Sequence, residues 1–167
     1  MRGLISLALS LLLLVSSALG ASSQEPITRG NFTILLWQSA GGVSYDVSAC
    51  PFSDVEPNAF WGQAVCWAWD EGLVQGTGDG LFSPDRLLTR EECAALLRRN
   101  DARLGRDTFF PDAGICNDFQ DISPWADDSL YWACSTGRMD WLDNRLAPYA
   151  PVTQAEAEYW LDAPSRF

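Results

Sequence analysis

Apolar residues recur at helical spacing in three segments of the chain, and each segment opens with the same short motif. The motifs are Ile27-Thr28-Arg29, Leu88-Thr89-Arg90 and Val152-Thr153-Gln154. Three apolar residues at positions i, i+3 and i+4 follow each motif: Phe32, Leu35 and Leu36; Cys93, Leu96 and Leu97; Ala157, Trp160 and Leu161. This spacing predicts one face of a helix in each segment. An internal repeat of about 60 residues favours a binding protein over an enzyme.

The second copy of the repeat is the most complete. It opens with Phe52-Ser53-Asp54-Val55, and its apolar positions predict a first helix over about 58–72. The glycine-rich loop Gly76-Thr77-Gly78-Asp79-Gly80 follows, for which turn chemistry is the default interpretation. A second helix is expected to begin at Thr89 and to end near Arg99.

The other two copies are less complete. The third opens with Phe119-Gln120-Asp121-Ile122 as the match to 52–55, and its loop over 140–144 lacks glycine. The first holds only the closing half of a unit. We therefore expect an all-α fold of about five helices in helix-loop-helix order. The predicted units cover 21–45, 52–100 and 119–163.

The threonine of the motif has a structural explanation. Thr89 with Glu92, and Thr153 with Glu156, have the spacing of capping boxes, each typically worth about 1 kcal/mol to its helix. Thr28 has Asn31 in the place of the acid, so a weaker cap is expected there. The arginine of the motif lies in the first helical turn, where the helix dipole disfavours a cation. Arg90 and Arg29 are therefore candidates for ligand binding, with simple surface solvation as the alternative.

The N-terminus has the composition of a secretory signal peptide. Arg2 precedes an apolar run from Leu4 to Val15, and Ala18-Leu19-Gly20 resembles a cleavage site, so residues 1–20 are predicted to be removed. No second long apolar run follows, which predicts a secreted protein without a transmembrane or covalent anchor.

Composition excludes several kinds of chemistry. The formal net charge is −11, which disfavours nucleic acid as a partner. Histidine is absent, so neither Ser-His-Asp nor Cys-His catalysis is available. The five cysteines show no CxxC spacing, so no metal site and no cofactor are predicted. They are interpreted as small buried hydrophobes with one or two bridges, and their odd number leaves at least one without an intramolecular partner.

With these motifs the chain resembles the S-layer homology family. Residues 52–100 carry the family's Phe-x-Asp-Val opening, its Ala-Val-x-Trp-Ala helix, its Gly-x-Gly-Asp-Gly-x-Phe-x-Pro turn and its Thr-Arg-x-Glu close. Residues 119–163 match less closely, and 27–40 resemble the closing half of a unit. The resemblance implies one compact three-lobed module of about two and a half units, with binding grooves between the lobes.

The resemblance also implies a function. Family members bind cell-envelope polysaccharide non-covalently, typically a pyruvylated secondary wall polymer, which places the protein at the cell wall or cell surface. A pyruvyl group carries a carboxylate, for which arginine is the favoured bidentate partner. The expected ligand-binding residues are Arg90 first and Arg29 second, with Thr89, Thr28, Trp61, Trp125, Gly76, Gly78 and Gly80. Gln154 replaces the arginine in the third copy, so at most two grooves are expected to bind.

Two alternatives belong to other functional classes. Diverged repeats could pair with another surface protein instead of a polymer. An enzyme acting on wall glycan would need two acids facing each other across a cleft. Asp70-Glu71 and Asp127-Asp128 are adjacent acids, which point to different faces of a helix. No catalytic residue is therefore predicted.

Overall fold

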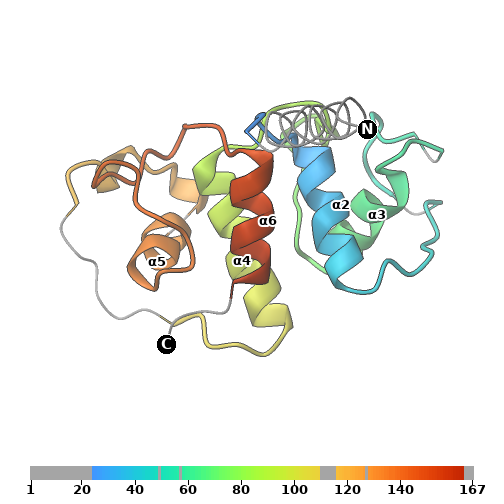
Figure 1. Ribbon diagram of the computed structural model, residues 1–167. Coiled ribbons are helices and arrows are strands. Elements are labelled where there is room, and N and C mark those ends of the chain that lie inside the picture. The colour runs from blue at the N-terminus through green and yellow to red at the C-terminus, as the bar shows by residue number, and fades with distance from the viewer. Residues whose placement is uncertain (1–23, 49, 57, 110–115, 127, 164–167) are drawn as a thin grey trace, which may run out of the picture.

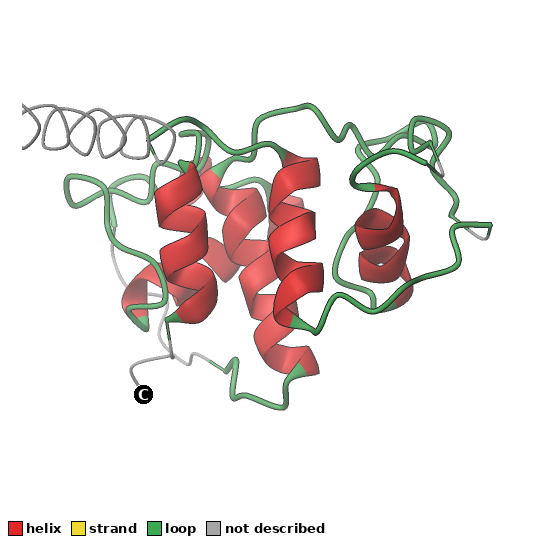
Figure 2. Ribbon diagram, turned by 45° about the vertical axis from the view of Figure 1, so that its right-hand side comes forward, coloured by secondary structure: helices red, strands yellow, loops and turns green. Residues whose placement is uncertain are grey.

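Helices are the only regular elements in the part of the chain that the computed structural model describes, residues 24–48, 50–56, 58–109, 116–126 and 128–163 (Figures 1 and 2). The five α-helices are α2 (Arg29–Ser39), α3 (Gly62–Asp70), α4 (Arg90–Arg103), α5 (Ser129–Ser135) and α6 (Gln154–Asp162). Two short 3-10 helices, η1 (Phe119–Asp121) and η2 (Pro124–Ala126), precede α5. The predicted all-α class with five helices is confirmed. The predicted signal peptide lies outside the described residues.

Threonine caps the three helices that follow the repeated motif. The hydroxyl groups of Thr89 and Thr153 accept from the amide three residues on, and the glutamate at that position accepts from the threonine amide in return. Both predicted capping boxes are therefore confirmed. Thr28 accepts from the amide of Asn31 at 3.2 Å, without the reciprocal contact. The sequence difference at Asn31 thus changes the cap as expected.

The three motifs meet in a closed ring of backbone hydrogen bonds. The amide of Ile27 donates to the carbonyl of Val152 (2.8 Å), Val152 donates to Leu88 (3.0 Å), and Leu88 donates to Ile27 (2.9 Å). All three side chains are buried. The repeats are therefore arranged around a pseudo-threefold axis, with α2, α4 and α6 starting from it.

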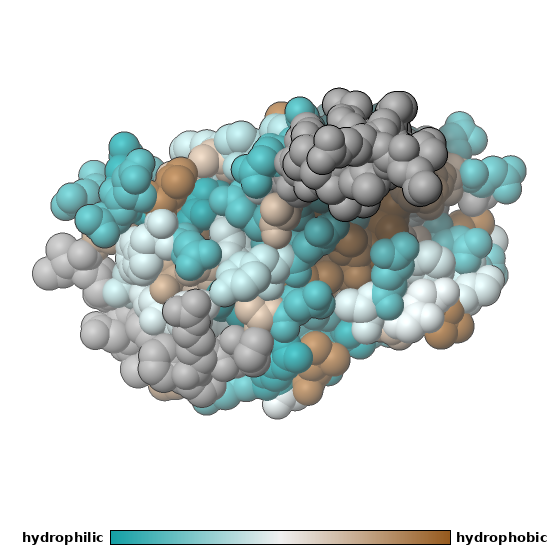
Figure 3. All heavy atoms as spheres, in the orientation of Figure 1, coloured by the Kyte–Doolittle hydropathy of each residue, from teal (hydrophilic) through white to brown (hydrophobic). Residues whose placement is uncertain are grey.

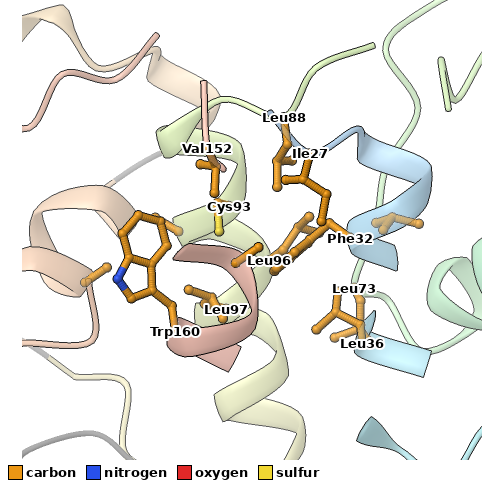
Figure 4. Packing of buried hydrophobic residues seen from close by; sticks show 14 of the residues in the cluster. Ile27, Phe32, Leu36, Leu73, Leu88, Cys93, Leu96, Leu97, Val152 and Trp160 are labelled. Carbon is orange, nitrogen blue, oxygen red and sulfur yellow. The ribbon is translucent and has the colours of Figure 1, made fainter. Parts of the chain in front are cut away.

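The core lies between these three helices. In Figure 4, Phe32 of α2 lies beside Leu96 of α4, while Leu97 of α4 lies nearer to Trp160 of α6, whose ring extends to the other side of the cluster. Outside this centre, α2 packs on α3 and α4 packs on α5. Each closing helix therefore packs on the first helix of the following unit, and α3 and α5 lie on opposite sides of the molecule (Figure 1).

The register predicted for the opening of the third unit is wrong by three residues. Asp54 accepts from the amides of Phe82 and Ser83 at 2.8 and 2.7 Å. In the third unit Asp118, not Asp121, makes the equivalent bonds, at 3.0 and 2.9 Å, to the amides of residues 146 and 147. The opening of the third unit therefore begins at Cys116, which takes the place of Phe52. Phe119 made residues 119–122 the better match by composition.

The loop of the third unit keeps its turn without glycine. In the second unit Gly78, Asp79 and Gly80 all have positive φ, which glycine adopts without strain. In the third unit Asp143 and Asn144 adopt φ values of 50° and 59°. Asparagine and aspartate tolerate this region better than other side chains do. Loss of the glycines therefore does not abolish the turn.

Two helix boundaries differ from the prediction. The first helix of the second unit begins at Gly62 rather than near 58, because residues 58–61 form successive turns. The closing helix continues to Arg103, beyond the predicted end near Arg99. Asp101 lies in the added turn, and its buried carboxylate pairs with Arg138 at 2.9 Å. This ion pair stabilises the longer helix.

Candidate functional site

A groove of about 610 Å³ lies where the first, second and third units meet, beside the N-terminal half of α4. Three arginines, two aromatic residues and a glycine-rich loop contribute to its walls. It is lined by Arg29, Val74, Gln75, Gly76, Thr77, Arg86, Thr89, Glu91, Glu92, Ala95, Leu96, Arg99, Trp125 and Tyr149. Of the predicted site residues, the groove brings together Arg29, Thr89, Gly76 and Trp125.

Arg29 forms part of the floor of the groove and is only 7% exposed. Its guanidinium donates to the carbonyls of Phe82 and Gln75, both at 3.1 Å, and pairs with Glu92 at 2.8 Å. It also lies over the Phe82 ring, 4.7 Å from the centroid. Burial lowers the pKa of Arg29, and the opposite charge of Glu92 works against that shift. The side chain fixes the first unit onto the loop of the second.

Glu92 connects three residues at the groove. One carboxylate oxygen binds both Arg29 and Arg86, and the other accepts from the amide and the hydroxyl of Thr89. The capping box of α4 is therefore also the anchor for two arginines. Because Glu92 is shared between two cations, it leaves the groove with an excess of positive charge.

Arg86 and Arg99 are the more accessible cations of the groove. The Arg86 side chain is 45% exposed. Arg99 is half-buried, donates to the carbonyl of Leu73 at 2.9 Å, and has its pKa lowered by burial. Neither residue was among the sequence candidates. A signal for Arg99 existed, since Glu92, Ala95 and Arg99 follow Thr89 at the spacing of one helix face.

Aromatic residues form another wall of the groove. Trp125 and Tyr149 remain 54% and 62% exposed. Glu91 accepts from the amide and the hydroxyl of Ser123, both at 2.9 Å, and so holds the turn that begins η2 and carries Trp125. The hydroxyl of Tyr149 donates to the carbonyl of Asp121 at 2.7 Å, which orients its ring.

Arg90, the first-ranked candidate from the sequence, lies outside this groove. It is 3% exposed, and it donates to the carbonyls of Leu146 and Asp140 at 2.8 and 2.6 Å. It also donates to the Cys134 sulfur at 3.5 Å and lies over the Trp160 ring. The two carbonyl contacts repeat those of Arg29 one unit further along. Arg90 therefore fixes the second unit onto the loop of the third.

The position around Arg90 that corresponds to the groove has different side chains. Aligned on the shared arginine contacts, Trp141 replaces Gly76, and alanines replace Arg86 and Arg99. The alanines are Ala150 and Ala163. The two more accessible arginines, Arg86 and Arg99, are thus specific to the groove at Arg29.

The remaining predicted site residues do not line this groove. Trp61 packs close to Gly30, where an added Cβ would meet its ring at 3.4 Å. Gly78 and Gly80 form the turn at the tip of the loop, and Thr28 caps α2. Gly76 differs from them, because an added Cβ would lie 2.8 Å from the carbonyl of Leu81.

The surface of the molecule is largely hydrophilic on the face shown in Figure 3, with hydrophobic residues in separate patches. None of the helices within the described residues is long and apolar enough to span a bilayer.

Comparison with known proteins gives the family and several relatives. The S-layer homology domain model matches residues 51–94. An endoglucanase of Bacillus sp. (strain KSM-635) is 29% identical over 116 residues, which are 69% of this chain and 12% of the relative. An amylopullulanase of Thermoanaerobacterium thermosulfurigenes is 26% identical over 142 residues, or 80% of this chain and 7% of the relative. The exoglucanase XynX of Acetivibrio thermocellus is 25% identical over 142 residues, or 80% of this chain and 12% of the relative.

The chain thus spans at most 12% of the length of these relatives. The region of similarity is their S-layer homology part. The chain therefore contains an S-layer homology domain, a cell-wall anchoring module of surface proteins, and it is homologous to the S-layer homology regions of surface glycoside hydrolases.

Proposed function

We propose that the groove at Arg29 binds an anionic cell-wall polysaccharide, and that the anion is the carboxylate of a pyruvylated sugar. The observation that carries the proposal is the presence of two accessible arginines and two exposed aromatic rings in one groove. Arginine binds carboxylates through paired hydrogen bonds. An aromatic ring offers an apolar face to a sugar ring, while its polar edge is held by hydrogen bonds.

The charges of the groove assign a role to each arginine. Arg29 has its donors satisfied by Glu92 and two carbonyls, so it supplies structure and background charge. Arg86 and Arg99 are the groups that can turn toward a ligand carboxylate. Trp125 and Tyr149 then receive the sugar rings, and the Gly76-Thr77 backbone borders the groove on the opposite unit.

Binding of the protein to purified pyruvylated wall polysaccharide tests the proposal. Arg86→Ala and Arg99→Ala are each expected to weaken binding by about tenfold or more, because a charged hydrogen bond is worth about 1.5–3 kcal/mol. Arg145→Ala is the matched control, since it removes the same charge from an exposed side chain outside the groove. Removal of the pyruvyl groups by mild acid should reduce wild-type binding to the level of the arginine variants.

The aromatic wall has its own matched control. Trp125→Ala should weaken binding, whereas Phe60→Ala should not. Phe60 is 79% exposed and is not among the residues that line the groove. A wild-type protein that binds pyruvylated and depyruvylated polymer equally would contradict the proposed ligand. A folded protein that ignores wall polymer altogether would favour a surface protein as the partner.

A further inference from the structure

Two of the five cysteines meet at α3. Cys66 lies within the helix and is 1% exposed. Cys50 ends the segment that connects α2 to the second unit and is partly buried against the same hydrophobic cluster. Burial is the main cause that raises the pKa of the Cys66 thiol, and the neighbouring Cys50 thiol adds to that shift. Both are free thiols in the structure.

Other contacts hold the same connector along α3. The amide of Tyr45 donates to the side-chain oxygen of Gln63 at 3.0 Å. The hydroxyl of Tyr45 hydrogen-bonds Asp70 at the far end of the helix, and this bond raises the pKa of Tyr45 to about 12. Cys50 therefore approaches Cys66 as part of a docked segment with contacts at both ends of α3.

Two of the remaining cysteines have other surroundings. Cys93 is completely buried at the centre of the core, where Figure 4 shows it between Val152 and Leu96. The Cys134 sulfur accepts from Arg90 and donates to the carbonyl of Asp140 at 3.7 Å. These contacts explain Cys93 as a small core residue and Cys134 as part of the Arg90 cluster.

We propose that Cys50 and Cys66 form a disulfide bond in the mature protein, which fastens the connector to α3. The geometry selects this pair because the connector that carries Cys50 is held along α3, and Cys50 packs against the hydrophobic cluster that contains Cys66. The bond is independent of the proposed ligand.

The chemistry requires an oxidant that is itself a disulfide, such as glutathione disulfide or the active-site disulfide of an oxidoreductase. The more accessible Cys50 thiolate attacks that disulfide and displaces one thiol. The Cys66 thiolate then attacks the Cys50 sulfur of the mixed disulfide and displaces the second thiol. Two protons leave the cysteines and two electrons pass to the oxidant. Burial raises the pKa of the Cys66 thiol to about 12, so the second step is faster while the connector is still folding.

The bond would support the groove from behind. Phe52 lies two residues after Cys50, and its ring packs 5.5 Å from that of Phe82, the ring beneath the Arg29 guanidinium. Phe52 also lies against Gly76 at the groove border. Fixing Cys50 therefore limits the movement of the residues on which the groove floor rests.

Peptide mapping of the full chain tests the proposal. The protein is produced in an oxidising compartment, blocked with N-ethylmaleimide and cleaved before aspartate. Cleavage at Asp46, Asp54 and Asp70 places Cys50 in 46–53 and Cys66 in 54–69, and the other three cysteines fall in further separate peptides. The expected product is 46–53 linked to 54–69, which reductant separates. Recovery of both peptides with the blocking label, or linkage of Cys50 to a different cysteine, would overturn the proposal.

Thermal unfolding gives a second readout. Reductant is expected to lower the Tm of the wild-type protein by about 5–10 °C, since a disulfide that closes a loop restricts the unfolded chain. Cys50→Ser should unfold at the same temperature with and without reductant. Cys116→Ser is the control, because it removes another partly buried thiol and should keep both the linked peptides and the reductant effect. An equal reductant effect in Cys50→Ser and the wild-type protein would contradict the assignment.

Discussion

Arg29 of the first unit and Glu92 of the second form a buried ion pair of 2.8 Å across the boundary between the two units. The same glutamate closes the capping box of its own helix through Thr89. One carboxylate therefore stabilises a helix terminus, fixes two units together and sets the charge of the groove. The fold and the candidate site depend on the same few atoms.

Arg29→Ala should destabilise the protein strongly. The change removes the cation from a buried pair and leaves the carbonyls of Phe82 and Gln75 without a donor, and a loss of about 3–5 kcal/mol in the free energy of unfolding is expected. Arg86→Ala removes the exposed partner of the same carboxylate and should cost at most about 1 kcal/mol. Urea unfolding of both variants measures the difference. Equal losses of unfolding free energy in the two variants would show that burial does not determine how much Arg29 contributes to stability.

Arg90→Lys should separate stability from binding. Lysine keeps the charge but cannot donate to Leu146 and Asp140 in the fork geometry of arginine, so a loss of about 2–3 kcal/mol in the free energy of unfolding is expected. Binding of wall polymer, measured where the variant is fully folded, should stay within about twofold of the wild-type value. A variant that is as stable as the wild type but does not bind polymer would restore Arg90 to the ligand site.

Asp118 should contribute to acid denaturation. Burial by itself would raise the pKa of this carboxyl group, but the amides of Ala147 and Leu146 and the nearby Arg145 outweigh it, and the net pKa is lowered. A lowered pKa in the folded state gives stability that is present above the unfolded-state value and is lost as pH falls through the folded-state value. Asp118→Asn should remove this dependence below about pH 4 and cost about 1–3 kcal/mol at pH 7. Urea unfolding at a series of pH values tests both effects. If Asp118→Asn loses stability at low pH in the same way as the wild type, Asp118 is not the source of the pH dependence.

Gly76→Ala should affect both the fold and the groove. The added Cβ would lie 2.8 Å from the carbonyl of Leu81 and 3.1 Å from the Phe52 ring, so the backbone of the loop has to move. Overpacking of this kind costs about 1–3 kcal/mol. Unfolding measurements give the cost, and polymer binding reports on the displaced groove wall. Thr77→Ala changes the neighbouring lining residue without crowding and should leave stability within about 1 kcal/mol of the wild type.

Local patterns in the sequence were sufficient to predict the three closing helices and their N-terminal caps. The spacing of apolar residues after each threonine predicts α2, α4 and α6, and Glu92 and Glu156 predict the two capping boxes. These features depend on residues three or four positions apart. The register of the third opening failed because Asp118 is defined by bonds to residues 28 and 29 positions away.

The groove could not be predicted from short sequence patterns, because its residues come from distant positions in the chain. Arg29 and Arg90 occupy the same place in the motif, and each inserts into the loop of the following unit rather than into its own. The arginine of one copy therefore lies beside the threonine of the next copy in the groove. Arg86 and Arg99 face that groove from positions before and after the motif, which no single short pattern connects.

The ring that joins Ile27, Leu88 and Val152 makes this array a closed one. In an open array of repeats the terminal units have one neighbour each and can unfold from the end. In the ring every unit supplies one amide and one carbonyl, so the loss of any unit leaves an unpaired donor and an unpaired acceptor in the core. The half unit at 27–40 is thus as necessary to closure as the complete ones, and the array is expected to unfold as a single cooperative body.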